Sequence, residues 1–103
     1  SELLGMASRH RCHPEVPVLK AVGNRVINGQ IDLVVARPDG LVVIDYKTDA
    51  AGAGIPHLAA HEARVRAYME VLAEATGQPV IEGWLLFCRR DGQPAESWPV
   101  RPA

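Results

Sequence analysis

Hydrophobic and polar positions divide the chain into several extended segments and one long helical segment. The apolar run Leu41–Ile44 predicts a strand buried on both faces, which then continues into polar residues. Between residues 56 and 76, apolar residues recur at i, i+3, i+4 and i+7, which predicts a helix with one buried face. Gly77 is expected to end this helix, and Pro79 prevents its continuation.

The remaining segments have the pattern of strands. In chain order they are residues 15–22, residues 25–27 with 31–36, residues 80–90, and a short final strand to Val100. Pro17 indicates an edge strand or the beginning of a strand, and Gly29 marks either a bulge or a close backbone approach. The turn Pro38-Asp39-Gly40 predicts a hairpin that joins the second strand antiparallel to the buried run.

The order of these elements, β-β-β-α-β, predicts an α/β fold with a mixed sheet flanked by helix. The two strands on either side of the helix should be parallel and joined by a right-handed crossover. We expect one domain, with residues 1–13 a partial N-terminal helix or linker, 14–90 the core and 91–103 a C-terminal tail. Weak helical pattern covers residues 1–12, and the abrupt start and proline-rich end predict a fragment of a larger protein.

Composition narrows the class of protein. The 103 residues are 48% hydrophobic and 22% charged, as is ordinary for a globular domain. The net charge of −1 argues against a stand-alone nucleic-acid binder. Cys12 and Cys88 lack CxxC spacing, which argues against zinc or iron–sulfur sites and favours reduced thiols. Because no apolar run approaches the roughly 20 residues of a membrane span, we expect a cytoplasmic protein without membrane association.

The candidate chemistry begins where the buried run ends. Asp45 and Lys47 should project to the same side of their strand, roughly 6.5–7 Å apart along it, with Tyr46 on the other side. Asp32 interrupts the neighbouring strand and can approach Asp45, whose partner is expected near positions 33–34. Two carboxylates beside a lysine form a hard-oxygen site, which suits Mg²⁺ better than zinc. The alternative is a strand-end salt bridge between Asp45 and Lys47.

The motifs along the chain resemble those of one nuclease family. They are Glu15-Val16-Pro17-Val18, Gly29-Gln30-Ile31-Asp32, Ile44-Asp45-Tyr46-Lys47-Thr48 and Arg64-Val65-Arg66-Ala67-Tyr68. Together they resemble the nuclease module of RecB/AddA-type helicase–nucleases, a branch of the PD-(D/E)XK superfamily, over residues 13–90. The thirteen-residue spacing of the two aspartates and the glycine three residues before the first are similar to the family. The last motif stands where the family carries Gln-hydrophobic-x-x-Tyr.

This resemblance implies a role for each matching residue. Asp32 and Asp45 would ligate Mg²⁺ (or Mn²⁺), the main-chain carbonyl of Tyr46 would add a ligand, and Glu15 would hold a second metal or a metal-bound water. Lys47 would position the attacking water and help to deprotonate it. Two further residues, one turn apart on the helix, are expected as auxiliary or DNA-contacting residues. Tyr68 lies in the apolar stripe as a core residue with its hydroxyl at the edge of the site. Arg64 replaces the family's glutamine and would either contact a DNA phosphate or mark a diverged site.

The resemblance implies a metal-dependent DNA exonuclease or endonuclease that hydrolyses phosphodiester bonds. DNA would be the substrate, and a helicase part of the same polypeptide or complex would be the partner in double-strand-break repair. The alternative is a catalytically inactive, nuclease-like module that guides DNA or docks proteins. Arg64 and the lack of the family's upstream metal-binding histidine favour that alternative, whereas intact Asp32, Asp45 and Lys47 oppose it.

Overall fold

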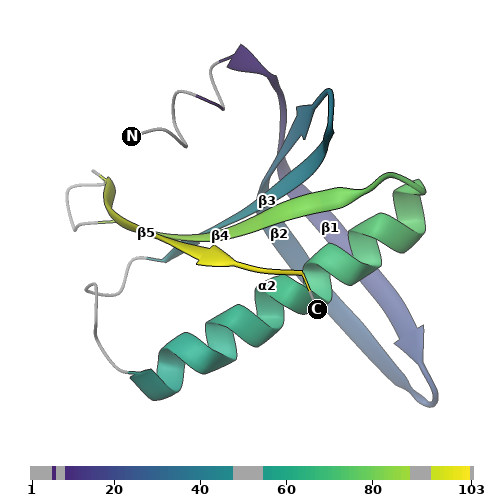
Figure 1. The fold of residues 1–103 in the computed structure, drawn as a ribbon. Coiled ribbons are helices and arrows are strands. Elements are labelled where there is room, and N and C mark those ends of the chain that lie inside the picture. Colours follow the sequence, from purple (N-terminus) through teal and green to yellow (C-terminus); the bar gives the residue numbers. More distant parts are fainter. Residues whose placement is uncertain (1–5, 7–8, 48–54, 89–93, 103) are drawn as a thin grey trace.

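A computed structural model describes the chain except for residues 1–5, 7–8, 48–54, 89–93 and 103. A five-stranded sheet with the order β1-β2-β3-β4-β5 forms its centre, and one long helix lies across one face (Figure 1). The strands are β1 (Arg11–Val22), β2 (Arg25–Arg37), β3 (Gly40–Lys47), β4 (Val80–Cys88) and β5 (Pro94–Val100), and the helix is α2 (Ile55–Thr76). The predicted α/β fold with a mixed sheet is confirmed, and a fifth strand lies in the expected tail.

Strand pairing follows the order of the chain. The pairs β1–β2, β2–β3 and β4–β5 are antiparallel, and β3–β4, joined through α2, is parallel as predicted. Arg37 pairs with Gly40, so the turn between β2 and β3 contains Pro38 and Asp39 alone. Because β1 is an edge strand, Pro17 costs no ladder hydrogen bond on its outer side.

Strand β3 is buried on both faces, as its apolar run predicts. Val43 packs into the core between the sheet and α2, and Val42 and Ile44 pack into a second core on the opposite face. The helix contributes Val65, Tyr68, Met69 and Leu72 to the first core. It can approach β4 closely because that strand carries Gly83, where a Cβ atom would lie 2.9 Å from Cγ1 of Val65.

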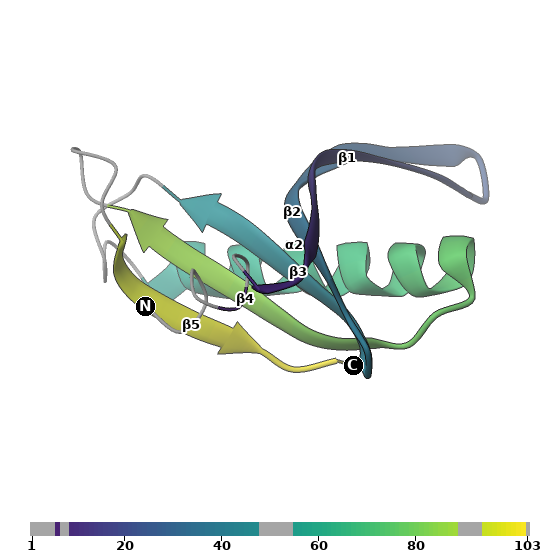
Figure 2. The same ribbon diagram turned by 90° about the horizontal axis from the view of Figure 1, so that it is seen from above.

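One prediction for the first half of the chain is wrong. Arg11 and Cys12 were expected in a helix but lie in β1, where they pair with the end of β2 that leads into the turn to β3. Of the two interpretations of Gly29, the bulge is excluded, because the second strand is continuous through Gly29, which pairs regularly with Val18. The distal half of hairpin β1–β2 bends away from the plane of the other strands (Figure 2). An ion pair of 2.8 Å between Lys20 and Glu74 joins it to α2.

Candidate active site

The candidate site lies where β2 separates from β3. Their last backbone pair joins Leu33 and Ile44, and continuing that register brings Asp32 opposite Asp45. The sequence prediction of a partner near 33–34 is therefore wrong, because the tight turn shifts the register. Beyond this pair a side chain of β2, rather than a backbone carbonyl, accepts the hydrogen bond from β3. Oδ2 of Asp32 accepts a hydrogen bond of 2.7 Å from the main-chain N–H of Tyr46. The opening between the strands is thus bridged by a carboxylate.

At this same level, the side chains of β1 and β2 stop alternating regularly between the two faces of the sheet. In a regular strand Ile31 and Leu33 would share a face, yet Ile31 packs into the core under α2 and Leu33 into the opposite core. On β1, Glu15 stands opposite Asp32 with a φ of 55°, in the left-handed region. A non-glycine residue held there costs about 1–3 kcal/mol, and such strain concentrates at functional sites. The strain therefore marks the level of Glu15 and Asp32 independently of the motifs.

Asp45 is a buried carboxylate with an incomplete set of partners. The residue is 5% exposed, and its Oδ2 lies 2.9 Å from Nζ of Lys47, on the same side of β3 as predicted. The ammonium attracts this oxygen by charge, but the angle is unfavourable for a hydrogen bond, and the oxygen has no such partner among the described residues. Because a buried charged oxygen is costly without hydrogen bonds, Asp45 is suited to accept an additional ligand.

The two aspartates influence each other electrostatically. Burial, followed by the neighbouring carboxyl of Asp45, raises the pKa of Asp32, whereas the N–H of Tyr46 and the charge of Lys47 lower it. Two carboxylates this close repel each other when both are ionised. A cation shared between them would remove that repulsion, and their oxygens are the ligands that Mg²⁺ and Mn²⁺ prefer.

Helix α2 brings a second cation to the site. Nε of Arg64 donates a hydrogen bond of 2.9 Å to the hydroxyl of Tyr68, and the guanidinium carbon lies 5.6 Å from the centroid of the tyrosine ring. The Tyr68 hydroxyl, followed by the charges of Asp45 and Asp32, raises the pKa of Arg64. Tyr68 itself is 3% exposed and contacts the backbone of Gly29. The close-approach interpretation of Gly29 is thus the correct one.

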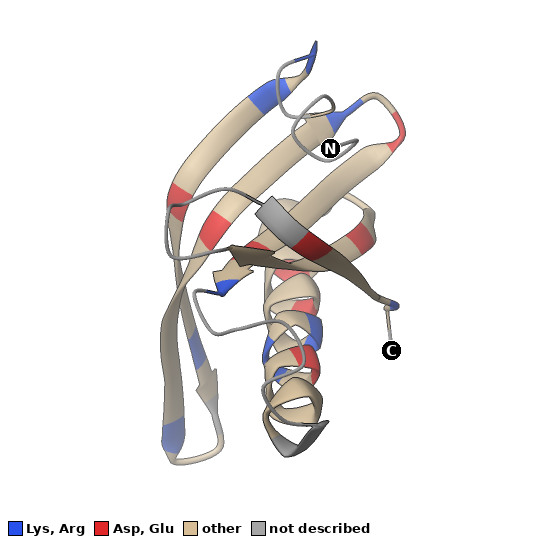
Figure 3. Ribbon diagram, turned by 90° about the vertical axis from the view of Figure 1, so that its left-hand side faces the viewer, with Lys and Arg blue, Asp and Glu red and all other residues tan. Residues whose placement is uncertain are grey.

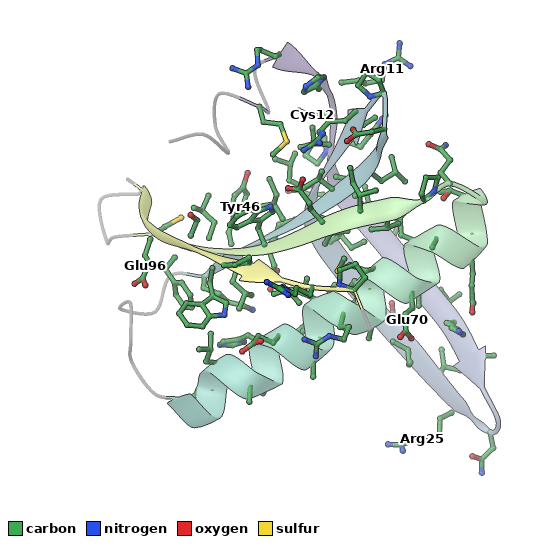
Figure 4. All side chains as sticks on the ribbon, viewed as in Figure 1. Arg11, Cys12, Arg25, Tyr46, Glu70 and Glu96 are labelled. Carbon is green, nitrogen blue, oxygen red and sulfur yellow. The ribbon has the colours of Figure 1, made fainter. Side chains whose placement is uncertain are left out.

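The structure brings together Asp32, Asp45 and Lys47, and the charges of the two aspartates also act on Arg64. The side chain of Tyr46 lies on the face opposite α2 (Figure 4), whereas its main-chain N–H donates to Asp32. Glu15 is exposed, and within the described ranges no group of three or more acidic, histidine or cysteine side chains is arranged to hold a metal. The ligand roles of Glu15 and of the Tyr46 carbonyl remain predictions. Thr48, the last residue of its motif, lies outside the described residues.

Two features of the site were missed by sequence reasoning: the hydrogen bond from the Tyr46 N–H and the left-handed backbone at Glu15. A close neighbour of Gly29 was among the expectations, since a glycine inside a strand pattern indicates one, but the sequence did not identify that neighbour as Tyr68.

Comparison with known proteins assigns the chain to a family. The model of the PD-(D/E)XK nuclease superfamily matches residues 4–100, almost the whole chain. The chain belongs to this superfamily. A search of curated proteins found no match. Among solved structures, the crystal structure of SSO0001 superposes with a TM-score of 0.64 at 22% identity, over 98% of this chain and 46% of that chain. This likeness shows the fold, and the chain spans less than half the length of that protein.

The superfamily assignment confirms the broader part of the resemblance read from the motifs. The chain is a nuclease-family domain, a class that generally acts on DNA with the help of divalent metal ions. Basic and acidic residues are intermixed along α2, so this helix does not present a continuous basic surface (Figure 3). In the part of the chain that the structure describes, no helix is long and apolar enough to span a membrane.

Proposed function

We propose that this domain is a metal-dependent DNA nuclease of the RecB/AddA type, which hydrolyses phosphodiester bonds. One observation carries the proposal: Oδ2 of Asp45 is buried beside the ammonium of Lys47, next to the carboxylate of Asp32, and has no hydrogen-bond partner in the part of the chain that the structure describes. A strand-end salt bridge alone would not need the second carboxylate, whose proximity is unfavourable without a cation.

The residues present fit a single Mg²⁺ or Mn²⁺ ion. Among the described residues Oδ2 of Asp45 has no hydrogen bond, and Asp32 uses Oδ2 for the Tyr46 N–H, so an ion shared by the two carboxylates would be held by Oδ2 of Asp45 and Oδ1 of Asp32. Glu15 and the main-chain carbonyl of Tyr46 are proposed as further ligands. Bound there, the ion would lower the pKa of a coordinated water and offset charge that develops on the phosphate.

Lys47 is proposed to position the attacking water and to assist its deprotonation. Its side chain is 15% exposed, and the ion pair with Asp45 holds the ammonium beside the carboxylate of Asp45. A partly buried cation stabilises developing negative charge more strongly than one in bulk water, because the local dielectric constant is lower.

The wider context is proposed from the motifs. A helicase part of the same polypeptide or complex would deliver DNA to the domain during double-strand-break repair in the cytoplasm. The intermixed charges of α2 and the net charge of −1 support this division of labour, because most of the DNA-binding surface would belong to the partner.

The alternative is a nuclease-like scaffold without catalysis. Two observations favour it: Arg64 stands in the position of the family's glutamine, and Glu15 is exposed rather than gathered with the aspartates. In that case the carboxylate pair would persist as a remnant of the family fold.

Cleavage of labelled linear and circular DNA tests the proposal. We expect cleavage with Mg²⁺ or Mn²⁺, none with EDTA, and loss of cleavage in Asp45→Asn. Asp39→Asn is the matched control, because Asp39 is an exposed acid at the hairpin turn that pairs with Arg37. Attack on circular DNA would identify an endonuclease. Absence of cleavage, together with absence of calorimetric Mg²⁺ and Mn²⁺ binding, would support the scaffold.

A further inference from the structure

We propose that Arg64 is a phosphate-binding catalytic residue in this chain and that Tyr68 is its positioning residue. The catalytic part rests on the proposed nuclease function, whereas phosphate binding by Arg64 can be measured without it. The proposal depends on two contacts described above, Gly29 with Tyr68 and Tyr68 with Arg64, and on the electrostatic influence of Asp32 and Asp45 on Arg64.

The guanidinium group of Arg64 is held at Nε by Tyr68. Its Nε–H is used by the Tyr68 hydroxyl at 2.9 Å, which leaves the N–H groups of the two terminal nitrogens without a hydrogen bond among the described residues. Among the described residues this is the single hydrogen bond that Arg64 makes, and no ion pair joins it to Asp32 or Asp45. The residue is also exposed. The forked end of Arg64 is therefore free to bind an anion from solvent.

The contacts among Gly29, Tyr68 and Arg64 restrict the position of the arginine side chain. Tyr68 is 3% exposed, and its ring lies in the core beneath α2. Its hydroxyl can reach Arg64 because Gly29 has no side chain, since a Cβ there would lie 2.9 Å from Cζ of the tyrosine. A long arginine side chain loses much rotational freedom when it binds a ligand. Here part of that entropy is already lost before binding, which favours two-pronged recognition of a phosphate.

The charge of the site also favours binding of a phosphate. Lys47 and Arg64 together balance the two negative charges of Asp32 and Asp45, so a divalent ion would make the site positive. A positive site favours a phosphodiester anion and the additional charge of its transition state. If Arg64 only neutralised the aspartates, it would be expected to form an ion pair with one of them, and within the described part of the chain it does not.

The test combines binding and cleavage in four variants: Arg64→Gln, Arg64→Lys, Tyr68→Phe and the double variant Arg64→Gln/Tyr68→Phe. Arg66→Gln is the matched control, because it lies on the same helix but donates to the carbonyl oxygen of Arg101. Binding of a fluorescent oligonucleotide is measured by anisotropy in EDTA. Cleavage is measured under single-turnover conditions with Mg²⁺, and circular dichroism confirms that each variant is folded.

We expect Arg64→Gln to weaken oligonucleotide binding by about tenfold and to slow cleavage by about tenfold to a hundredfold. Arg64→Lys should restore only part of each loss, since lysine lacks the fork. Tyr68→Phe should have a several-fold effect in the wild-type background and none in Arg64→Gln, because the hydroxyl acts through the arginine.

Two results would overturn the proposal: equal oligonucleotide binding by Arg64→Gln and the wild type, or effects of Tyr68→Phe and Arg64→Gln that simply add. A wild-type chain that binds the oligonucleotide through Arg64 but cuts no DNA would refute the nuclease function and the catalytic part of the proposal. It would leave the phosphate-binding part standing.

Discussion

The contact between Gly29 and Tyr68 leads to a quantitative prediction for Gly29→Ala. Gly29 pairs regularly with Val18 and is not among the glycines with positive φ, so alanine meets no backbone strain there. The added Cβ would lie 2.9 Å from Cζ and 3.0 Å from Cε1 of Tyr68, with the hydroxyl closer still. These separations are shorter than van der Waals contact, and the buried ring must move.

The expected cost is the difference between two effects. Over-packing a well-packed core costs about 1–3 kcal/mol. Replacing a glycine inside a strand by alanine recovers about 0.5–1 kcal/mol of backbone entropy. We therefore expect Gly29→Ala to lower the free energy of unfolding by about 1–2 kcal/mol.

Urea unfolding followed by tryptophan fluorescence measures this change. Tyr68→Phe removes the atom nearest to the added Cβ, so it should relieve part of the clash, and the cost of Gly29→Ala should be smaller in that background. A stabilising or neutral Gly29→Ala, or a cost unchanged by Tyr68→Phe, would refute the packing argument.

Three further predictions concern the carboxylates and their cations. Because the pKa of Asp32 lies above the ordinary 3.8, the folded chain holds this proton to higher pH than the unfolded chain. The contribution of Asp32 to the free energy of unfolding should fall as the pH rises from its unfolded-state pKa to its higher folded-state pKa. Asp32→Asn should remove this trend in urea titrations with EDTA, and a rise of stability over the same pH range would contradict the raised pKa of Asp32. Mg²⁺ at about a hundredfold its Kd should add about 2.7 kcal/mol of stability to the wild type and little to Asp45→Asn in thermal melts. Lys47→Ala should abolish cleavage by the intact parent protein while calorimetric metal affinity stays largely unchanged, so retained cleavage would exclude its role.

Patterns among neighbouring residues of the sequence predicted most of the fold. The apolar run of β3 and its turn predicted a doubly buried strand in a hairpin, because burial and turn chemistry are properties of neighbouring residues. Arg11 and Cys12 were assigned wrongly, since their strand forms only by pairing with residues 35 and 36, far along the chain. The N-terminal half of β1 thus depends on a tertiary contact that outweighs a weak helical pattern.

The site was less predictable than the fold for a related reason. The motifs named Asp32, Asp45 and Lys47, but they did not specify how β2 leaves β3. At the same level β1 carries the left-handed backbone of Glu15, a residue type with no preference for such a conformation. Likewise, a glycine at position 29 predicts a close neighbour without identifying it, and only the packing of α2 shows that the neighbour is Tyr68.

The tight turn between β2 and β3 also has a consequence for the order of folding. Asp32 and Asp45 face each other across a hairpin closed by two residues, and such local hairpins form within about 1–10 μs. We therefore expect their charges to meet before α2 and β4, which are further along the chain, can bury them or supply Arg64. The electrostatic cost of the site then affects how fast the sheet assembles. A proton or a divalent cation that neutralises the pair would accelerate folding as well as stabilise the folded domain.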